Sequence, residues 1–175
     1  MRGTDIGLAG FEVVEAKDEA YRLVLRHLFE LYVYDFSEYT GADVHASGSY
    51  DVVERDYWND AFPHRYVAMV DGRIAGFALV RRGSPIDDDA AASWMEEFFV
   101  LRKYRRRGVG AALARDVFAR FPGRWQVAVL RNNLPAQSFW RRTIGGITAG
   151  AYNERAWDSE AWRGPVLYFA WGGGP

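Results

Sequence analysis

The spacing of apolar residues changes several times along the chain, and each change of period marks a predicted element. Residues 11–14 form a short apolar run that is typical of a strand. From Asp18 to about Tyr34, apolar residues recur three and four positions apart, and the aspartate can cap the start of a helix. The helical face carries Tyr21, Val24, Leu25, Leu28, Leu31 and Tyr32. The N-terminal part is therefore expected to be a strand followed by an amphipathic helix.

The next part of the chain has weaker patterning. Residues 35–50 are polar and aromatic, and they contain two glycines that interrupt regular structure. Residues 50–58 are expected to form a second, short helix. This part is therefore predicted to contain little regular structure apart from one helix of about two turns.

A β-hairpin is predicted where two strand-like runs flank a turn dipeptide. Residues 65–70 and 73–80 are rich in apolar residues, and Asp71-Gly72 separates them. Both central residues of a type I′ turn need positive φ, which glycine adopts freely and aspartate tolerates. This dipeptide is therefore a strong hairpin signal.

Strands and helices alternate over the rest of the chain. The predicted elements are, in order, a loop at residues 82–91, a strand at 93–101, a helix to about 121, a strand at 125–130, a helix through 142, and strands at 147–152 and 166–171. Pro135 suits the first turn of the second of these helices, and Gly145-Gly146 is expected to end it. This order predicts an α+β (mixed α/β) fold, an open mixed sheet with helices on both faces. Residues 1–171 are expected to form one domain, with a flexible tail at 172–175.

Composition narrows the class of protein. The chain has 175 residues, of which 49% are hydrophobic and 16% aromatic, enough for a sizeable core. It contains no cysteine, which excludes a thiol nucleophile and a disulfide framework. Its three histidines are scattered without metal-ligand spacing, so no metal site is expected.

Charge and hydropathy also limit the partners. The formal net charge is −1, so the chain lacks the basic excess that is typical of nucleic-acid-binding proteins. No run approaches the length of about 20 apolar residues that spans a membrane, and no apolar signal segment begins the chain. Neither nucleic acid nor a membrane is therefore expected as a partner, and the expected location is the cytoplasm. Seven tryptophans and an expected edge strand make a homodimer plausible.

The most informative motif is a glycine turn between a strand and a helix. Arg105-Arg106-Arg107-Gly108-Val109-Gly110 follows the strand that ends near Leu101 and opens the helix that begins near Ala111. A helix start offers unpaired backbone N–H groups and the positive end of the helix dipole, and both favour phosphate. Glycines let a ligand approach the backbone closely, and arginines keep their charge at any working pH. The motif predicts a ligand that carries a diphosphate.

This turn lacks the features of two common nucleotide-binding motifs. It has no Lys-Ser/Thr pair, which a P-loop requires, and no third glycine of the dinucleotide fingerprint. Placed between a strand and a helix, it instead resembles the Gln/Arg-x-x-Gly-x-Gly/Ala acetyl-CoA motif of the GNAT N-acetyltransferases. Asn133-x-x-Ala136-x-x-Phe139-Trp140 resembles the second CoA segment of that family, Asn-x-x-Ala-x-x-x-Tyr. Across residues 10–171 the resemblance implies an open, mostly antiparallel sheet of six to seven strands with splayed central strands.

The resemblance implies acetyl-CoA as co-substrate and assigns residues to it. Arg105 begins the cofactor-binding motif. The backbone N–H groups that would hold the diphosphate are those of the next six residues, Arg106, Arg107, Gly108, Val109, Gly110 and Ala111. The backbone of Phe99, Val100 and Leu101 would pair with the pantetheine amides. Asn133 would hydrogen-bond the pantetheine arm, beside which Ala136 and Phe139 would pack. Trp140 stands where the family usually has the tyrosine that protonates the leaving thiolate, and an indole N–H does not release a proton near neutral pH.

The implied reaction is direct transfer of an acetyl group to a primary amine of a small molecule or peptide. A free alkyl amine is almost wholly protonated at pH 7, so a base is needed. Glu96 and Glu97 are candidates; strand alternation predicts that they point to opposite faces, and the family often has a carboxylate at Glu97. A backbone donor near Val100 would stabilise the oxyanion. Glu97 is therefore slightly favoured, and the alternative is that either glutamate is an ordinary surface acid.

The acceptor side is expected at the first helices and the last strands. The candidate residues are Tyr34, Asp35, Glu38 and Tyr152, of which the two acids would suit a cationic amine. The alternative is that these acids form a solvated helix end and that the tyrosines pack. The substitution at Trp140 also leaves open a second function, that of an acyl-CoA-binding sensor of the same fold without turnover.

Overall fold

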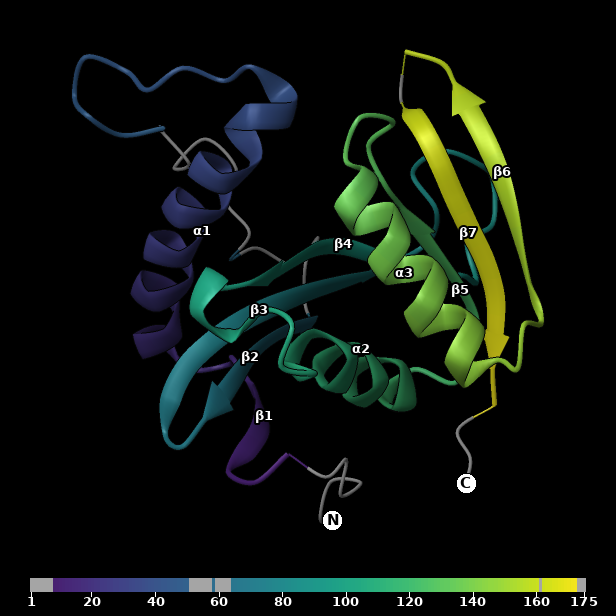
Figure 1. Cartoon of the computed structure of the whole chain (residues 1–175), viewed down its shortest axis with the longest axis horizontal. Coiled ribbons are helices and arrows are strands. Elements are labelled where there is room, and N and C mark those ends of the chain that lie inside the picture. The colour runs from purple at the N-terminus through teal and green to yellow at the C-terminus, as the bar shows by residue number, and fades with distance from the viewer. Residues whose placement is uncertain (1–7, 51–57, 59–63, 161, 173–175) are drawn as a thin grey trace.

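The computed structural model describes residues 8–50, 58, 64–160 and 162–172. These residues form a seven-stranded sheet in the order β1-β2-β3-β4-β5-β7-β6, which Figure 1 shows with its helices. The elements are β1 (Phe11–Glu15), α1 (Glu19–Thr40), β2 (His64–Val70), β3 (Arg73–Arg82), β4 (Ser93–Val100), α2 (Val109–Arg120), β5 (Gly123–Ala128), α3 (Leu134–Ile147), β6 (Tyr152–Asp158) and β7 (Arg163–Trp171). The predicted α+β fold with an open mixed sheet is confirmed.

The sheet is antiparallel except at its centre, where β4 and β5 run parallel. These two strands pair only at Ser93↔Trp125 and Trp94↔Gln126. From Met95 to its end, β4 therefore lies beyond this pairing and the two strands diverge, as Figure 1 shows. The splayed central strands implied by the resemblance are present.

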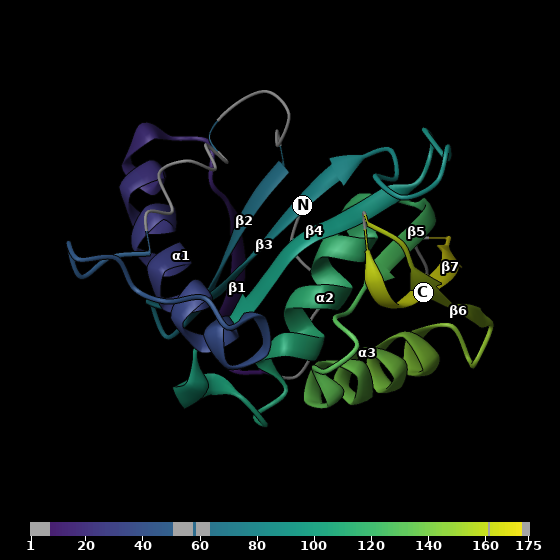
Figure 2. The same cartoon turned by 90° about the horizontal axis from the view of Figure 1, so that it is seen from above.

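The two faces of the sheet are covered by different helices. α1 lies on one face, and α2 and α3 lie on the other (Figure 2). The α1-side core includes Leu25, Leu28 and Phe29 packed with Val67, Phe77, Leu79 and Phe99. The α2-side core includes Leu113, Val117, Phe118, Trp125, Ile144 and Leu167. Alternate residues of β3 and β4 enter opposite cores because strand side chains alternate between faces.

The hairpin of β2 and β3 matches the sequence-based expectation. Asp71 and Gly72 have φ values of 51° and 70°, as a type I′ turn requires. The strands that they join pair from Val70↔Arg73 back to His64↔Val80. This local turn chemistry was readable without tertiary information.

Three boundaries differ from the prediction. α1 continues to Thr40 instead of ending near Tyr34, so the segment taken as irregular from residue 35 begins as helix. α3 runs through Gly145-Gly146 to Ile147, and the predicted strand at 147–152 is wrong. The strand that follows α3 is β6 (Tyr152–Asp158), which is mostly exposed and pairs with β7 at the sheet edge. An edge strand with polar side chains shows no apolar alternation, so its pattern gives no signal.

Two other predictions concern residues outside the described ranges. The short helix expected at residues 50–58 falls outside the described ranges, except for its first and last residues. Residues 173–175 of the expected tail also fall outside them. Among the helices that the structure describes, none combines the length and apolar character needed to cross a membrane.

Candidate functional site

The glycine turn leaves the start of α2 without a side-chain cap. Arg106 and Gly108 both adopt positive φ, at 58° and 84°, which turns the chain sharply from the end of β4 into the helix. Gly108 is the N-cap residue, and no side chain caps the helix there. The first intrahelical bond of α2 runs from the Ala112 N–H to the Gly108 carbonyl, at 2.9 Å. The N–H groups of Val109, Gly110 and Ala111 therefore have no acceptor within the helix. This arrangement favours an anion at the helix start.

Gly110 also has a packing role that the sequence did not reveal. A Cβ atom added here would lie 3.1 Å from Cε2 of Phe139 and 3.6 Å from Cγ2 of Val100. β4, α2 and α3 therefore meet at this glycine. The two motif segments that are about 30 residues apart in sequence are brought into contact, since Phe139 belongs to the second.

The backbone of β4 presents alternate residues to the gap between β4 and β5. The Leu101 N–H donates to the Ala75 carbonyl at 2.9 Å, on the β3 side. Because N–H and C=O groups alternate in direction along a strand, those of Val100 point to the other side, toward β5. The Arg105 Nε donates to the Val100 carbonyl at 2.8 Å. The Val100 N–H thus faces the diverging gap.

This alternation bears on the predicted pairing of three successive residues with pantetheine, because two of the three N–H groups face β3. The Leu101 N–H is already bonded to β3, and the Phe99 backbone, two residues earlier, points the same way. Of the three N–H groups, that of Val100 is the one directed toward the gap. A sequence motif names the strand residues but does not state which edge each one faces.

The predicted second CoA segment forms the start of α3. The Asn133 side chain caps this helix by accepting a hydrogen bond from the Ala136 N–H at 3.0 Å, and the asparagine is buried. Phe139 stacks on Phe98 with ring centroids 5.7 Å apart. Trp140 is 5% exposed and packs edge-on to Phe98 at 4.8 Å, so it is part of the core between α3 and β4.

The two glutamates of β4 lie on the same face, which corrects the expectation that they point to opposite faces. The register shifts between Leu79↔Glu97 and Val80↔Met95, so Glu96 is an extra residue in β4. Leu79 belongs to the α1-side core and Val80 to the α2-side core. Arg81 lies two residues after Leu79 in β3 and therefore on the same face of the sheet. Glu96 contacts this arginine, with its Oε2 3.7 Å from the Arg81 Nε. The β-bulge therefore places both carboxylates on the α1 side.

Glu97 is the more buried of the two and has a hydrogen-bond partner on α1. Glu97 is 8% exposed, and its Oε2 accepts a hydrogen bond from the Tyr32 hydroxyl at 2.5 Å. Sequence reasoning placed Tyr32 on the apolar face of the helix and did not assign it a polar contact. The pairing of residues 32 and 97 is a long-range contact that no local pattern signals.

Of the four predicted acceptor residues, only Tyr34 and Glu38 keep exposed side chains near the end of α1. Tyr34 is 63% exposed, and Glu38 is also exposed. Tyr152 lies elsewhere: it pairs with Phe169 and packs against the α2-side core, level with the closed end where β4 and β5 pair. The structure does not bring Tyr152 together with the other three.

Asp35 has two arginine partners within the chain. Arg102 Nε lies 2.6 Å from its Oδ1, and Arg105 Nη2 lies 2.5 Å from its Oδ2. Burial raises the pKa of Asp35, but the hydrogen bonds and charges of Arg105 and Arg102 outweigh it, and the pKa lies below its usual range. The carboxylate is therefore engaged in holding α1 against the segment after β4, rather than presented to a cationic acceptor.

A second contact ties α1 to the other side of the gap. Asn132, in the segment between β5 and α3, donates through Nδ2 to the Tyr39 carbonyl at 2.7 Å. The last turns of α1 are thus bonded both to the segment after β4 and to the segment after β5. Neither Arg102 nor Asn132 was singled out from the sequence, because both act through partners more than 60 residues away.

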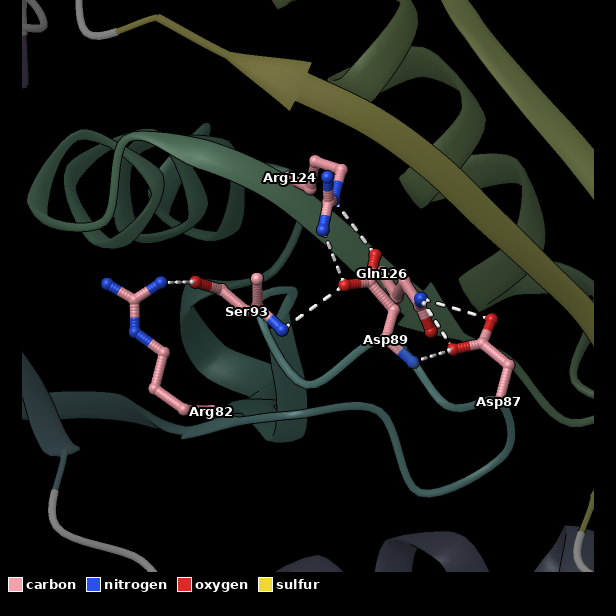
Figure 3. A network of polar contacts seen from close by, with 7 residues as sticks. Arg82, Asp87, Asp89, Ser93, Arg124 and Gln126 are labelled. Atoms are coloured by element: carbon pink, nitrogen blue, oxygen red, sulfur yellow. Dashed lines mark hydrogen bonds and ion pairs between the residues drawn. The ribbon is translucent and has the colours of Figure 1, made fainter.

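The closed end of the strand pair is held by a polar network, which Figure 3 shows. Asp89 accepts two hydrogen bonds from Arg124, at 2.9 and 2.7 Å, and Asp87 accepts from Gln126 Nε2 at 3.1 Å. Burial raises the pKa of Asp87, but hydrogen bonds from Gln126 and Ser84 lower it more, so the carboxyl stays charged well into the acid range. These aspartates fasten the β3–β4 loop to β5.

No group of three or more potential metal-ligating side chains is present in the part of the chain that the structure describes. The candidate site combines three features: the uncapped start of α2, the edge of β4 that faces the diverging gap, and two carboxylates on the opposite face of the sheet. Such a set can bind an anionic cofactor tail and accept a proton.

Comparisons with known proteins agree with this geometry. The family model described as "Acetyltransferase (GNAT) family" matches residues 25–145, which include both predicted CoA segments. No curated protein matches the sequence.

Solved structures share the fold at low identity. A structure from Corynebacterium glutamicum described as "histone acetyltransferase HPA2 and related acetyltransferase" has a TM-score of 0.64, with 16% identity over 95% of this chain and 98% of the other. A GNAT-family acetyltransferase from Staphylococcus aureus has a TM-score of 0.60, with 12% identity over 91% and 98%. A ribosomal-protein-alanine N-acetyltransferase from Brucella melitensis has a TM-score of 0.57, with 18% identity over 90% and 96%. These likenesses concern the fold.

Proposed function

Since the chain belongs to the GNAT family of N-acetyltransferases, whose members use acetyl-CoA, we propose that it transfers an acetyl group directly to a primary amine of a small molecule or peptide. The observation that carries this proposal is the junction of β4 and α2. The uncapped start of α2 follows β4, whose last residues are not paired with β5. Diphosphate and thioester can then be held by one continuous stretch of backbone.

The cofactor is assigned to the α2 side of the sheet. Its diphosphate would accept hydrogen bonds from the N–H groups of residues 106–111, at the positive end of α2. Its pantetheine arm would enter the gap, where the Val100 N–H is directed. Ala136 and Phe139 are partly buried beside the same core and would line the arm, and Asn133 would contribute its amide next to its capping role.

The acceptor amine is assigned to the opposite face, where the β4 carboxylates lie. The neutral amine nitrogen forms the new C–N bond, the C–S bond breaks, and CoA leaves as the thiolate. The amine must lose one proton, which Glu97 would accept, directly or through a water. The Val100 N–H would stabilise the oxyanion of the tetrahedral intermediate.

One observation favours a second function, the acyl-CoA sensor. Trp140 is a core residue at the position of the family's tyrosine, so this position offers no phenol to the leaving thiolate. A sensor would bind acetyl-CoA and transfer nothing. Release of free thiol separates the two functions directly.

The test is acetyl-CoA turnover with a panel of amines. We expect release of free thiol and an acetylated product with at least one primary amine, and a loss of 10²-fold or more on Glu97→Gln. Tight acetyl-CoA binding without thiol release for any amine would favour the sensor. Full turnover in Glu97→Gln would remove that residue from the base assignment.

The diphosphate assignment is tested by placing a negative charge at the start of α2. Ala111→Glu suits the third helical position for folding, since acids there interact favourably with the helix dipole. The new carboxylate would repel the diphosphate, and we expect the calorimetric Kd for acetyl-CoA to rise about tenfold or more. The neutral isostere Ala111→Gln is the control and should change Kd by less than about threefold. Equal Kd values for both variants would place the diphosphate elsewhere.

A further inference from the structure

We propose that Tyr32 of α1 is a positioning residue for the reaction: its hydroxyl holds the Glu97 carboxylate in the orientation and charge state in which it accepts the amine proton. This inference rests on the proposed function, because it assigns a role to the partner of the proposed base. It concerns a residue that neither CoA segment contains.

The hydrogen bond joins two elements that meet only in the folded chain. The Tyr32 hydroxyl donates to Glu97 Oε2 at 2.5 Å across 65 residues of sequence. α1 and β4 contribute one residue each, and the contact lies on the α1 side of the sheet. At this distance the hydrogen bond is at the short end of the range for O–H donors to carboxylates.

The tyrosine ring is fixed by the rings around it. Its centroid lies 5.6 Å from that of Phe99, 5.9 Å from that of Phe77 and 6.0 Å from that of Phe29, in edge-to-face arrangements. Phe36, one turn further along α1, lies 4.6 Å away. A ring held on four sides keeps its hydroxyl aimed at one carboxylate oxygen, so the acceptor group is preorganised.

The position of Glu97 gives this hydrogen bond a role beyond satisfying a buried group. Glu97 lies in the part of β4 that has diverged from β5, three residues before Val100, whose N–H faces the gap. Its neighbour Glu96 approaches Arg81 instead, at 3.7 Å. Glu97 thus has a phenol hydroxyl as a hydrogen-bond donor, and it lies closer along β4 to the Val100 N–H than Glu96 does.

A phenol that donates to a carboxylate favours the charged form of that carboxylate. This donor offsets part of the cost of holding a charged carboxylate at a residue that is 8% exposed. When the amine nitrogen attacks, its proton moves to Glu97 and the electron pair of the broken C–S bond leaves with sulfur. The Tyr32 proton stays on its own oxygen throughout, so Tyr32 positions the base and does not act as the acid.

The experiment compares Tyr32→Phe with the wild-type enzyme. Phenylalanine keeps the ring packing and removes only the hydroxyl. We expect kcat to fall about tenfold, less than the loss of the base itself, with KM for acetyl-CoA changed by less than about twofold. We also expect the acidic limb of the kcat/KM–pH profile to move to higher pH, because the charged carboxylate has lost a donor.

A second variant strengthens the same hydrogen bond instead of removing it. A fluorotyrosine introduced at position 32 alone has a more acidic hydroxyl, and we expect it to move the acidic limb to lower pH. Tyr21→Phe is the control, since Tyr21 packs against the same α1-side core and is not part of the site; its profile should match the wild type.

The outcomes separate this inference from the proposed function. If Glu97→Gln loses turnover but neither variant at position 32 shifts the acidic limb, the role of Tyr32 is overturned and the base assignment stands. If Glu97→Gln turns over normally, the base assignment itself fails. A fall in kcat with no shift of the limb would mean that the hydroxyl does not set the charge state of Glu97, and would overturn the inference as stated.

Discussion

At the scale of single residues, the side chain at position 140 shows how one position can serve packing in place of chemistry. Trp140 has ring contacts with Phe98 at 4.8 Å, Phe139 at 4.9 Å and Phe118 at 6.2 Å. These contacts join α3, β4 and α2 in one core. A tyrosine there would lose part of this buried area and gain a hydroxyl, so stability and turnover are expected to change in opposite directions.

We expect Trp140→Tyr to raise kcat, because a phenol is supplied where the family protonates the leaving thiolate. The same change should lower the free energy of unfolding by about 1–3 kcal/mol through lost packing. Trp140→Phe is the matched control, with a similar loss of stability and no gain in kcat. Turnover assays and urea denaturation measure the two effects. If the phenol variant turned over no faster than the phenylalanine variant, the thiolate would receive its proton by another route.

At the scale of elements, the end of α1 is held by charge pairs rather than by apolar contacts alone. Asp35 is the buried acid of this group, and Arg102 and Arg105 reach it from the segment after β4. Arg105 also donates to the Val100 carbonyl, so the same guanidinium contacts both α1 and the strand end. The position of α1 over the site is therefore coupled to the backbone that is assigned to the thioester.

We expect Asp35→Asn to lower the free energy of unfolding at pH 7 by about 1 kcal/mol, a modest loss because Arg102 is mostly exposed and Arg105 partly so. The pKa of Asp35 is lower in the folded chain than its usual value. Its contribution is therefore present above the unfolded pKa of about 3.9 and is lost as pH falls through the folded pKa.

The measurement is denaturant unfolding of wild type and Asp35→Asn from pH 7 down to pH 3. The difference between the two should shrink below about pH 4. Glu38→Gln, which changes an exposed acid on the same helix, is the control and should leave stability within about 0.5 kcal/mol. A difference that stayed constant across this range would contradict the charge-pair interpretation.

At the scale of the whole molecule, the sheet consists of two parts joined by a narrow parallel contact. β1 to β4 form one part and β5 to β7 the other, and only two residue pairs connect them within the sheet. The network of Asp87 and Asp89 holds the closed end (Figure 3), whereas α1 is bonded to both sides at the other end. Beyond Trp94 and Gln126 the two parts are therefore not paired with each other, while each keeps its own strand pairing.

Hydrogen exchange should report this division when acetyl-CoA binds. We expect added protection at the amides of residues 106–111 and at Val100, since these N–H groups are assigned to the cofactor. The Leu101 amide, already bonded to Ala75, should change little. Amides of β7 serve as the internal control, because they pair with β5 and β6 with or without the cofactor. Protection of Leu101 without Val100 would reverse the strand-edge assignment.

The sequence by itself determined the features that depend on neighbouring residues. The Asp71-Gly72 turn, the glycine turn at Gly108 and the position of Pro135 in the first turn of α3 were predicted from the sequence, because backbone conformation depends on residues a few positions apart. The family resemblance rested on two such local segments, and the order of elements followed from apolar periodicity. The exposed edge strand β6 was missed because it has no apolar period.

Only the tertiary structure decided which distant side chains share the site. The bulge at Glu96 put both glutamates on one face, Arg102 and Arg105 took Asp35, and the hydroxyl of Tyr32 met Glu97. These outcomes depend on strand register and on how α1 lies across the sheet. The position of the bulge and the placement of the helix depend on the packing of the whole core, and the identities of residues along one segment do not encode them.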